Sequence, residues 1–539
     1  MKKYLTIIFI ALFSVACNSL DQYPVDRFTE DNYWTSAEKA MSVLNKAYNQ
    51  MNNAEFNYSL EALTDNVYQR RAHSEKIISA GQGNAATDKF YNTWKNSFNC
   101  IKTCHIFLEN VDRVPDMSAA LKERAKAEAR FIRAYSFLML ATWYGDAPLF
   151  TSSISLADSK TISRTPHEEI IKFVMDELDE VAEILPKREE YGDSDRGRVT
   201  AGAAMALKAR ACLFNNDWQN CLSACEKLMD GGAYGTYSLY ESYSDLFTVK
   251  AEYCPEIILD IQYVPSFKVW EDYQDFMPPS VLGRVSKMAP TKELVDDYIM
   301  INGKGIYESG SEYDENAPYD NRDPRLDMTI VRHLGTWTMA DGSVRTIYTK
   351  PGSTPSTDVS GGADEYKVGD EKTSPTGYYF KKGYDVTAVN GKTSGMNVIV
   401  MRWADVLLMR AESSNELGRF NEEVWNSTIK QLRLRAGFPE DSEALVYNPS
   451  WSQDDLRTII RRERRSELAF EGNRIFDIRR WRIAEKVMNG RPHGDRFENN
   501  NTEYILLPER SFDPDRDYLW PVPQSEKDIN PNLGQNPGY

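Results

Sequence analysis

The sequence predicts a mainly α-helical fold: a tetratricopeptide-like scaffold of helical hairpins, with a loop-rich irregular insertion that carries short β segments. Three observations predict it. Apolar residues recur with the helical period in several stretches. Pairs of short helices, rich in small residues, are joined by tight polar turns. From about 262 to 397 the helical period is lost, and Gly, Pro, Ser, Asp and Tyr dominate.

Two lysines at positions 2 and 3 precede an apolar run over residues 4–15. That run is too short to cross a bilayer, which needs about 20 apolar residues. Small residues and Cys17 follow, which is the pattern of a bacterial lipoprotein signal. We therefore expect residues 1–16 to be a signal peptide and Cys17 to carry lipid. The alternative is an ordinary signal peptide followed by a chance cysteine.

Composition narrows the class of protein. The chain is 41% hydrophobic and 27% charged, which is typical of a folded protein. Its formal charge of −16 argues against nucleic acid as a partner, because nucleic-acid binding needs a basic face. The same charge argues against electrostatic docking on anionic lipid.

The first helices are predicted from capping signals and apolar stripes. The sequence Thr165-Pro166-His167-Glu168 has the form of a capping box. After it, one helix face collects Ile171, Val174, Leu178, Val181 and Leu185. An earlier apolar stripe, Phe131, Ile132, Tyr135, Leu138 and Met139, is followed by a stop signal at Gly145.

Two helical hairpins follow in the middle and in the second half. A helix over 200–214 and a second one from Trp218 onward are joined by a short polar turn. Cys221 and Cys225 lie on the inner face of the second helix, where we interpret them as small buried hydrophobes. The same design recurs at 404–417 and 421–434.

Cofactor and metal signals are weak. Cys100, Cys104 and His105 could suggest a metal site, but they lack a second ligand pair and fit a helix face. We expect no metal and no cofactor. The usual nucleophile, phosphate-loop and zinc-helix motifs are missing from the sequence, which predicts no catalytic residues.

A run of charged residues needs its own interpretation: Glu463, Arg464, Glu467, Glu471 and Arg474. Spacings of three and four place such groups along one helix side, where opposite charges pair. We interpret the run as structural. Paired carboxylates for glycoside hydrolysis are the alternative, and they would need a defined separation across a cleft.

Several motifs in chain order resemble the SusD/RagB family of outer-membrane lipoproteins from Bacteroidetes. They are AEARFIRA at 127–134, WYGDAPL at 143–149, GRVT at 197–200, RDPRL at 322–326, MRWADVLL at 401–408, the ER, ELAFEG and RW elements of 461–481, WPVP at 520–523, NPNL at 530–533 and QNPGY at 535–539. One departure is His105, near which the family often has Asn.

The resemblance implies a tetratricopeptide-like scaffold attached by lipid to the extracellular face of the outer membrane. It also implies a partner, a SusC-like TonB-dependent transporter, and a ligand that is an oligosaccharide or polysaccharide. A peptide ligand is the second hypothesis, and a secreted glycoside hydrolase is a distant third. We divide the chain into a signal peptide (1–16), an N-terminal helical region (17–261), a loop-rich insertion (262–397) and a C-terminal helical region (398–539), all folded as one unit.

The resemblance implies that the segment after the first helices and the loops of the second region build the ligand site. Flat aromatic rings cover the C–H face of a sugar, and polar clamps satisfy its hydroxyls. The matching stretches contain Asp65, Arg70, Arg71, Trp94, Trp270, Tyr273 and Trp337. Trp270 and Trp337 are the foremost candidates, because they lie in sequence without helical period. Trp94 could equally be a core residue, Asp65 and Arg70 could be a solvated pair, and Arg71 is the weakest candidate.

Overall fold

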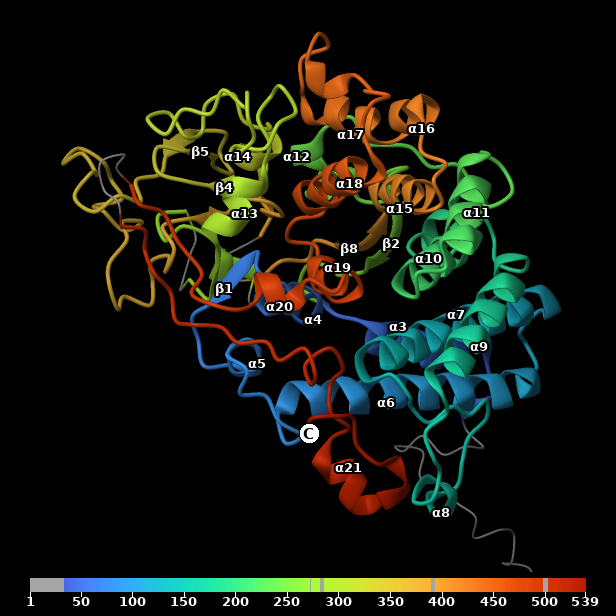
Figure 1. Ribbon diagram of the computed structural model, residues 1–539. Coiled ribbons are helices and arrows are strands. Elements are labelled where there is room, and N and C mark those ends of the chain that lie inside the picture. The colour runs from blue at the N-terminus through green and yellow to red at the C-terminus, as the bar shows by residue number, and fades with distance from the viewer. Residues whose placement is uncertain (1–32, 272, 282–285, 389–392, 498–502) are drawn as a thin grey trace, which may run out of the picture.

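The computed structural model describes residues 33–271, 273–281, 286–388, 393–497 and 503–539. The predicted signal peptide and Cys17 therefore lie outside the described residues. Helices fill one side of the molecule, and the loop-rich part with its short strands occupies the other (Figure 1). The prediction of a mainly helical fold with a loop-rich region is confirmed.

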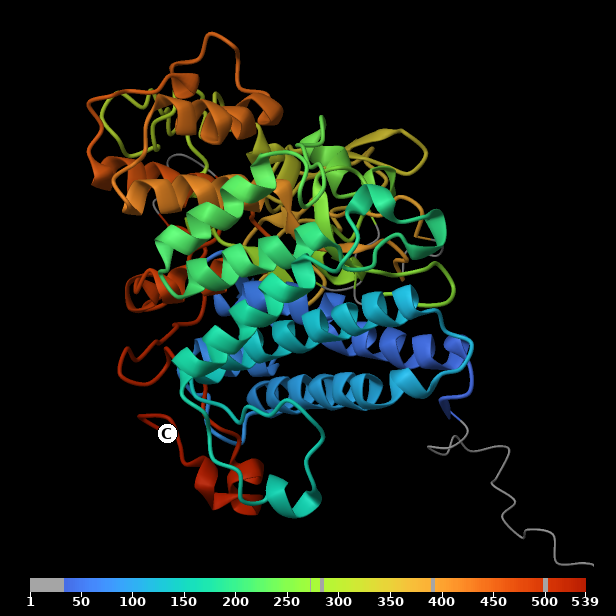
Figure 2. The same cartoon turned by 90° about the vertical axis from the view of Figure 1, so that its right-hand side faces the viewer.

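The helical scaffold is a continuous stack of long helices. In chain order these are α3 (Ala37–Met51), α6 (Asp88–Asn110), α7 (Ala119–Tyr144), α9 (His167–Ala182), α10 (Ala201–Phe214), α11 (Trp218–Met229), α15 (Trp403–Glu416) and α18 (Gln453–Glu467). Helices α3 and α6 pack on α7, α7 on α9, α9 on α10, α10 on α11, α11 on α15 and α15 on α18. Figure 2 shows this succession of layers. The stack thus joins the two halves of the sequence through α11 and α15.

Shorter elements connect and cover the stack. The shorter α-helices are α4 (Ala54–Ser59), α5 (Ser74–Ser79), α8 (Leu156–Ser159), α12 (Tyr243–Leu246), α13 (Lys292–Asp297), α14 (Arg325–Thr329), α16 (Glu422–Ser427), α17 (Ile429–Ala436), α19 (Arg474–Arg480), α20 (Ala484–Val487) and α21 (Gln524–Ile529). The 3₁₀ helices used below are η3 (Arg188–Glu190), η5 (Val249–Ala251) and η6 (Tyr273–Phe276).

The strands form antiparallel pairs rather than a larger sheet. The pairs are β1 (Val67–Gln69) with β3 (Met288–Pro290), β2 (Ile257–Ile261) with β8 (Val398–Arg402), β4 (Ile330–Val331) with β7 (Tyr379–Phe380), and β5 (Thr336–Thr338) with β6 (Val344–Thr346). The β1–β3 pair ties the loop-rich region to the N-terminal helical region, and the β2–β8 pair ties the two helical regions to each other.

The predicted end signals hold for α7 and α10 but not for α9. Thr200 caps α10 by accepting a hydrogen bond from the backbone N of Ala203 at 3.0 Å, and Gly145 ends α7 with φ +71°. Helix α9 differs, because its N-cap is Pro166 and its cap has no side-chain hydrogen bond. The carboxylate of Asp146 instead accepts from the backbone N of His167 at 2.9 Å. The predicted capping box is therefore wrong.

The predicted helix 421–434 is divided in two. Helix α16 ends at Ser427 and α17 begins at Ile429, because Thr428 lies outside the helical region with φ −128° and ψ −89°. Burial of the flanking side chains, Val424, Trp425 and Ile429, overrides the continuous periodic pattern at this point. The small residues of the other predicted hairpin behave as expected, since Cys221 and Cys225 are fully buried and not in disulfides.

Neither metal nor membrane features are found in the described part of the chain. Cys100, Cys104 and His105 are buried, and no group of three or more potential His, Cys, Asp or Glu ligands gathers among the described residues. None of the helices in those residues is long and apolar enough to cross a membrane.

The run of charged residues around α18 forms a buried ion-pair network across elements. Its members are Arg325, Arg402, Arg435 and Lys382 with Asp323, Glu256, Glu463, Glu467 and Glu471. The expected pairing along one helix is wrong, because α18 ends at Glu467 and the partners come from other elements. Arg474 likewise pairs with Asp65, far away in the sequence. The network links the loop-rich region to the scaffold, as a structural role requires.

Candidate functional site

An open cleft of about 370 Å³ lies in the loop-rich region. We call it the tyrosine cleft, because Tyr313, Tyr319, Tyr378 and Tyr504 line it, with Phe497 beside them. Its polar lining includes Lys292, Asp296, Arg332, His333, Asp495 and Arg496. These residues come from α13, from the loop before α14, from the turn after β4, from the position before β7, and from residues 495–497 and 504. The segments converge on the left of the molecule in Figure 1.

Cations fix the rings of the tyrosine cleft. The guanidinium carbon of Arg332 lies 4.3 Å from the ring centre of Tyr319. The ring of Tyr504 has the Lys292 ammonium at 4.9 Å and the Arg496 guanidinium at 5.3 Å. Such contacts hold an aromatic ring in a defined orientation. The contacts favour defined orientations of the Tyr319 and Tyr504 rings, and such preorganisation lowers the entropy cost of binding.

A buried carboxylate forms the floor of the cleft. Asp495 accepts hydrogen bonds from the hydroxyl of Tyr319 at 3.4 Å and from the backbone N of Arg496 at 2.8 Å. Burial raises the pKa of Asp495, and these donors oppose the shift. The hydroxyls of Tyr319 and Tyr378 lie 3.3 Å apart. The floor thus offers two hydroxyls and a carboxylate in one connected group.

His333 is held as a neutral hydrogen-bond donor. Its Nδ1 accepts from the backbone N atoms of Thr349 and Lys350, both at 3.2 Å. Burial, together with Lys350 and Arg332, lowers the pKa of His333, so that the ring is uncharged at neutral pH. With Nδ1 accepting, the proton is assigned to Nε2, which makes that nitrogen a donor.

The cleft is suited to binding a polyhydroxylated molecule. It combines aromatic rings, fixed donors and fixed acceptors in a solvent-open groove, which is the combination that sugar rings and their hydroxyls require.

The two foremost sequence candidates are buried instead of forming an exposed platform. The exposed fraction is 8% for Trp270 and 1% for Trp337. Trp270 stacks on Tyr58, and Trp337 meets Tyr384 edge-on with ring centres 5.1 Å apart. Trp270 is held against the scaffold by its stack on Tyr58 of α4, whereas Trp337 packs on Tyr384 within the loop-rich region. As the structure stands, neither ring offers an open face to a ligand.

The other candidates are also placed by the structure. Trp94 is buried in α6 against Tyr144, and Asp65 is buried in ion pairs with Arg465 and Arg474, both at 2.9 Å. These arginines lower the pKa of Asp65 against the effect of burial. The alternative interpretation, in which Asp65 and Arg70 form a solvated pair, is thus wrong.

Arg70 is linked to the tyrosine cleft through Tyr366. Half-buried, it donates to the carbonyl of Asp370, and Tyr366 is among its electrostatic neighbours. The ring of Tyr366 lies 6.2 Å from Phe497 in the cleft. Arg71 is half-buried, and Tyr273 begins η6, although its side chain lies outside the described part of the structure.

Sequence reasoning missed the residues that line the tyrosine cleft. The tyrosines at 313 and 319, close together in a polar loop, were the available signal. Nothing in the sequence indicated that Asp495 and Tyr504 would lie beside them, because that arrangement arises only in the folded chain.

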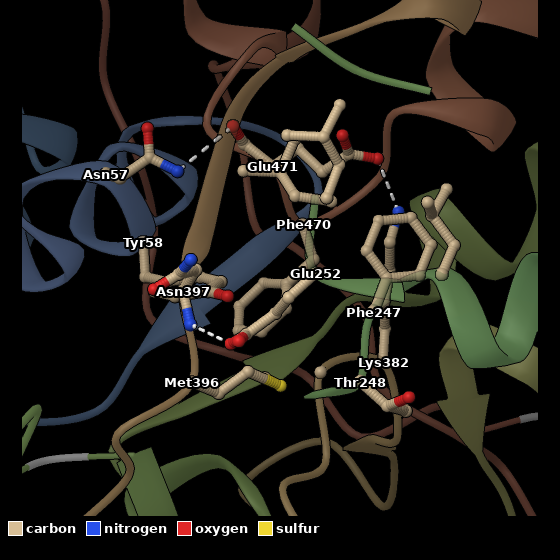
Figure 3. Close-up of a pocket in the computed structure, with 14 residues that line it drawn as sticks. Asn57, Tyr58, Phe247, Thr248, Glu252, Lys382, Met396, Asn397, Phe470 and Glu471 are labelled. Atoms are coloured by element: carbon tan, nitrogen blue, oxygen red, sulfur yellow. Dashed lines mark hydrogen bonds and ion pairs between the residues drawn. The ribbon is translucent and has the colours of Figure 1, made fainter. Parts of the chain in front are cut away.

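A small cavity near the buried ion-pair network is too small for a sugar. Figure 3 shows it between Asn57, Tyr58, Phe470 and the ion pair of Lys382 with Glu471, whose N and O atoms lie 2.6 Å apart. Its volume of about 30 Å³ holds one or two water molecules.

Comparisons with known proteins agree over nearly the whole chain. A family model described as "SusD family" matches residues 255–539, and one described as "Starch-binding associating with outer membrane" matches residues 20–213. SusD-like protein P2 of Formosa agariphila is 26% identical, with 100% of each chain covered. A SusD-like carbohydrate-binding protein of Bacteroides fragilis has a TM-score of 0.82 at 26% identity, covering 93% of this chain and 99% of that one. A laminarin-binding SusD-like protein shares the fold, with a TM-score of 0.69 at 20% identity and coverage of 94% and 100%.

Proposed function

The chain belongs to the SusD family, and on that premise we propose that it captures a glycan at the bacterial surface and delivers it to a SusC-like TonB-dependent transporter. The observation that carries the glycan proposal is the tyrosine cleft. Its rings can cover the C–H face of a sugar, while Asp495, His333 and the tyrosine hydroxyls can bond to the rim of hydroxyls. The name of the Bacteroides fragilis relative, a carbohydrate-binding protein, supports the same ligand class.

Binding without cleavage is the second part of the proposal. The hydrogen bonds that Asp495 accepts from Tyr319 and from the backbone N of Arg496 hold it as a fixed acceptor, which suits a binding role. We expect the purified protein to retain an oligosaccharide unchanged. Release of shorter products would favour the glycoside-hydrolase hypothesis instead.

The cleft is tested by affinity electrophoresis of the mature protein in gels containing neutral and acidic polysaccharides. Tyr504→Ala should weaken retention of the cognate glycan by about tenfold or more, as expected for an aromatic binding hot spot. Tyr91→Ala is the matched control, because Tyr91 is half-buried and carries a lysine over its ring at 5.5 Å, yet lies on α6. Equal retention of both variants and of the wild type would overturn the assignment of the site.

The last part of the proposal is that the protein is located at the outer membrane and binds a transporter there. The description of the N-terminal family match supports an outer-membrane association. A protein that delivers cargo must separate from its partner in part, so we expect an interface that is large but not wholly apolar. Gentle detergent extraction at native expression should co-purify a TonB-dependent barrel. Recovery of free monomer alone would contradict the partner.

A further inference from the structure

A second cleft, of about 450 Å³, shares no lining residue with the tyrosine cleft. We call it the Tyr253 cleft. It is lined by residues of η3, of the turn before α10, of η5 and of β2, including Arg188, Tyr191, Tyr237, Glu252, Tyr253 and Asp260. It therefore lies where the helical scaffold meets the β2–β8 pair, whereas the tyrosine cleft lies in the loop-rich region.

Tyr253 is held in an unusual conformation at this cleft. Its φ of +62° is in the left-handed region, which is unfavourable for any residue with a side chain. Tyr253 as a whole residue is nevertheless 39% exposed, so burial does not account for that conformation. Left-handed residues of this kind persist where surrounding contacts enforce them, and they cluster at ligand clamps.

Arg188 holds the Tyr253 backbone in this left-handed conformation. Its guanidinium donates to the carbonyl of Tyr253 at 3.0 Å and to the carbonyl of Thr236 at 3.3 Å. The same guanidinium lies 5.5 Å from the ring centre of Tyr237. One arginine thus braces the Tyr253 backbone and covers a second ring, which gives the cleft a rigid wall without a ligand.

The charges around the Tyr253 cleft select against a strongly ionic ligand. Two of its cations are already paired, Arg198 with Glu128 at 2.9 Å and Lys250 with Asp245 at 3.0 Å. Its carboxylates are bonded to neutral donors: Asn397 donates from its backbone N to Glu252 at 2.8 Å and from its side chain to Asp260 at 3.0 Å. Because these charges are already satisfied by neighbouring groups of the chain, the cleft suits an uncharged ligand rich in hydroxyls.

The small cavity of Figure 3 shares Glu252 and Ile257 with this cleft as lining residues. In the close-up Glu252 and Asn397 lie together, on the far side of the cavity from Glu471. The cavity admits water but no sugar ring, so a ligand would occupy the outer cleft against Tyr253. Glu252 would then face the ligand on one side and the small cavity on the other.

We propose that the Tyr253 cleft is a second binding site, specific for an uncharged saccharide. The exposed ring of Tyr253 covers one face of a sugar, and Glu252 and Arg188 bond to its hydroxyls. The proposal shares the ligand class of the proposed function, but it does not depend on the tyrosine cleft, with which it has no residue in common.

The test is hydrogen–deuterium exchange of the mature protein with four neutral hexasaccharides at millimolar concentration: β-1,3-glucan, α-1,4-glucan, β-1,4-xylan and β-1,4-mannan. At least one should protect peptides covering 185–200 and 250–256. Tyr253→Gly removes the ring and suits the positive φ, so the variant should fold and lose that protection, with about tenfold or more weaker binding there. Ser266→Gly, at another exposed left-handed position with φ +68°, is the control and should keep it.

The outcomes separate this proposal from the first one. Tyr504→Ala should leave protection at 185–200 and 250–256 intact. Protection confined to 313–334 and 495–510 would overturn the second site and keep the first. If Tyr504→Ala abolished protection in both pairs of regions, the protein would have one site only, and the second site would be overturned. Absence of protection in both regions, or protection at the Tyr253 cleft by a peptide pool alone, would overturn the saccharide site.

Discussion

The rings of Tyr58 and Trp270 stack face to face, with centroids 4.6 Å apart and planes 8° apart. The ring centre of Phe470 also lies 4.9 Å from that of Tyr58, with the two ring planes tilted. Tyr58 belongs to α4, and Trp270 belongs to the loop-rich region. The stack is therefore a joint between the scaffold and the loops, at a residue whose sequence context had indicated a ligand platform.

The stack predicts that Trp270→Ala destabilises the fold. Removing a buried indole leaves a cavity and costs about 3–5 kcal/mol, which urea unfolding would measure. Trp270→Phe keeps a ring beside Tyr58 and should cost clearly less. Unchanged unfolding of Trp270→Ala together with a large loss of glycan affinity would contradict the structural role and restore the platform.

Trp270 also shows where sequence reasoning stops. Helices such as α10 were predictable, because the Thr200 cap and the apolar period are local signals that survive folding. Burial of Trp270 and Trp337 was not, because loops without a period give no local sign of which face turns inward. The tyrosine cleft was harder still, since it joins Tyr319 to Asp495 across a long separation in sequence. The domain boundaries stay predictions.

The ion pairs of Arg325 predict that breaking the buried ion-pair network lowers the free energy of unfolding by a large amount. Arg325 is fully buried, and its guanidinium pairs with Asp323 at 2.7 Å, Glu463 at 2.7 Å and Glu467 at 2.8 Å. Arg325→Met leaves buried carboxylates without this partner and should cost about 3–5 kcal/mol in urea unfolding.

The matched control for Arg325 is an exposed pair. The side chain of Lys172 is 75% exposed in its pair with Asp176, so Lys172→Met should change the free energy of unfolding by about 1 kcal/mol or less. Similar costs for the two substitutions would contradict the structural interpretation of the network.

Cys17 predicts membrane attachment. One acyl chain holds a protein only marginally, whereas a multiply acylated cysteine holds it firmly. Cys17→Ser should move the protein from the membrane fraction to the soluble fraction, or leave it unprocessed. The measurement is fractionation with mass spectrometry of the N-terminus, in cells that lack any partner transporter. Membrane retention of the variant there would contradict the lipid anchor.

The burial of Glu61 predicts that its contribution to the stability of the fold decreases as pH rises. Its side chain is fully buried, and burial raises its pKa from 4.5 to about 7, although Asn66 and the backbone N of Gly472 donate to it. Because the folded pKa lies above the unfolded one, the folded state holds the proton more tightly. The stability due to Glu61 is fully present below about pH 4.5 and is lost as pH rises through about 7.

The comparison of wild type with Glu61→Gln isolates this effect, because other titrating groups contribute to both proteins. The amide introduced by Glu61→Gln cannot ionise and keeps an oxygen for Gly472, so the stability of the variant should lack the Glu61 component of the pH dependence. Between pH 4.5 and 8 the wild type should lose up to about 3 kcal/mol relative to the variant, since one pKa unit corresponds to about 1.4 kcal/mol. Urea unfolding at several pH values measures it. A constant difference across that range would show that Glu61 titrates with the same pKa in the folded and unfolded states, and a difference of opposite sign would show that its partners outweigh burial.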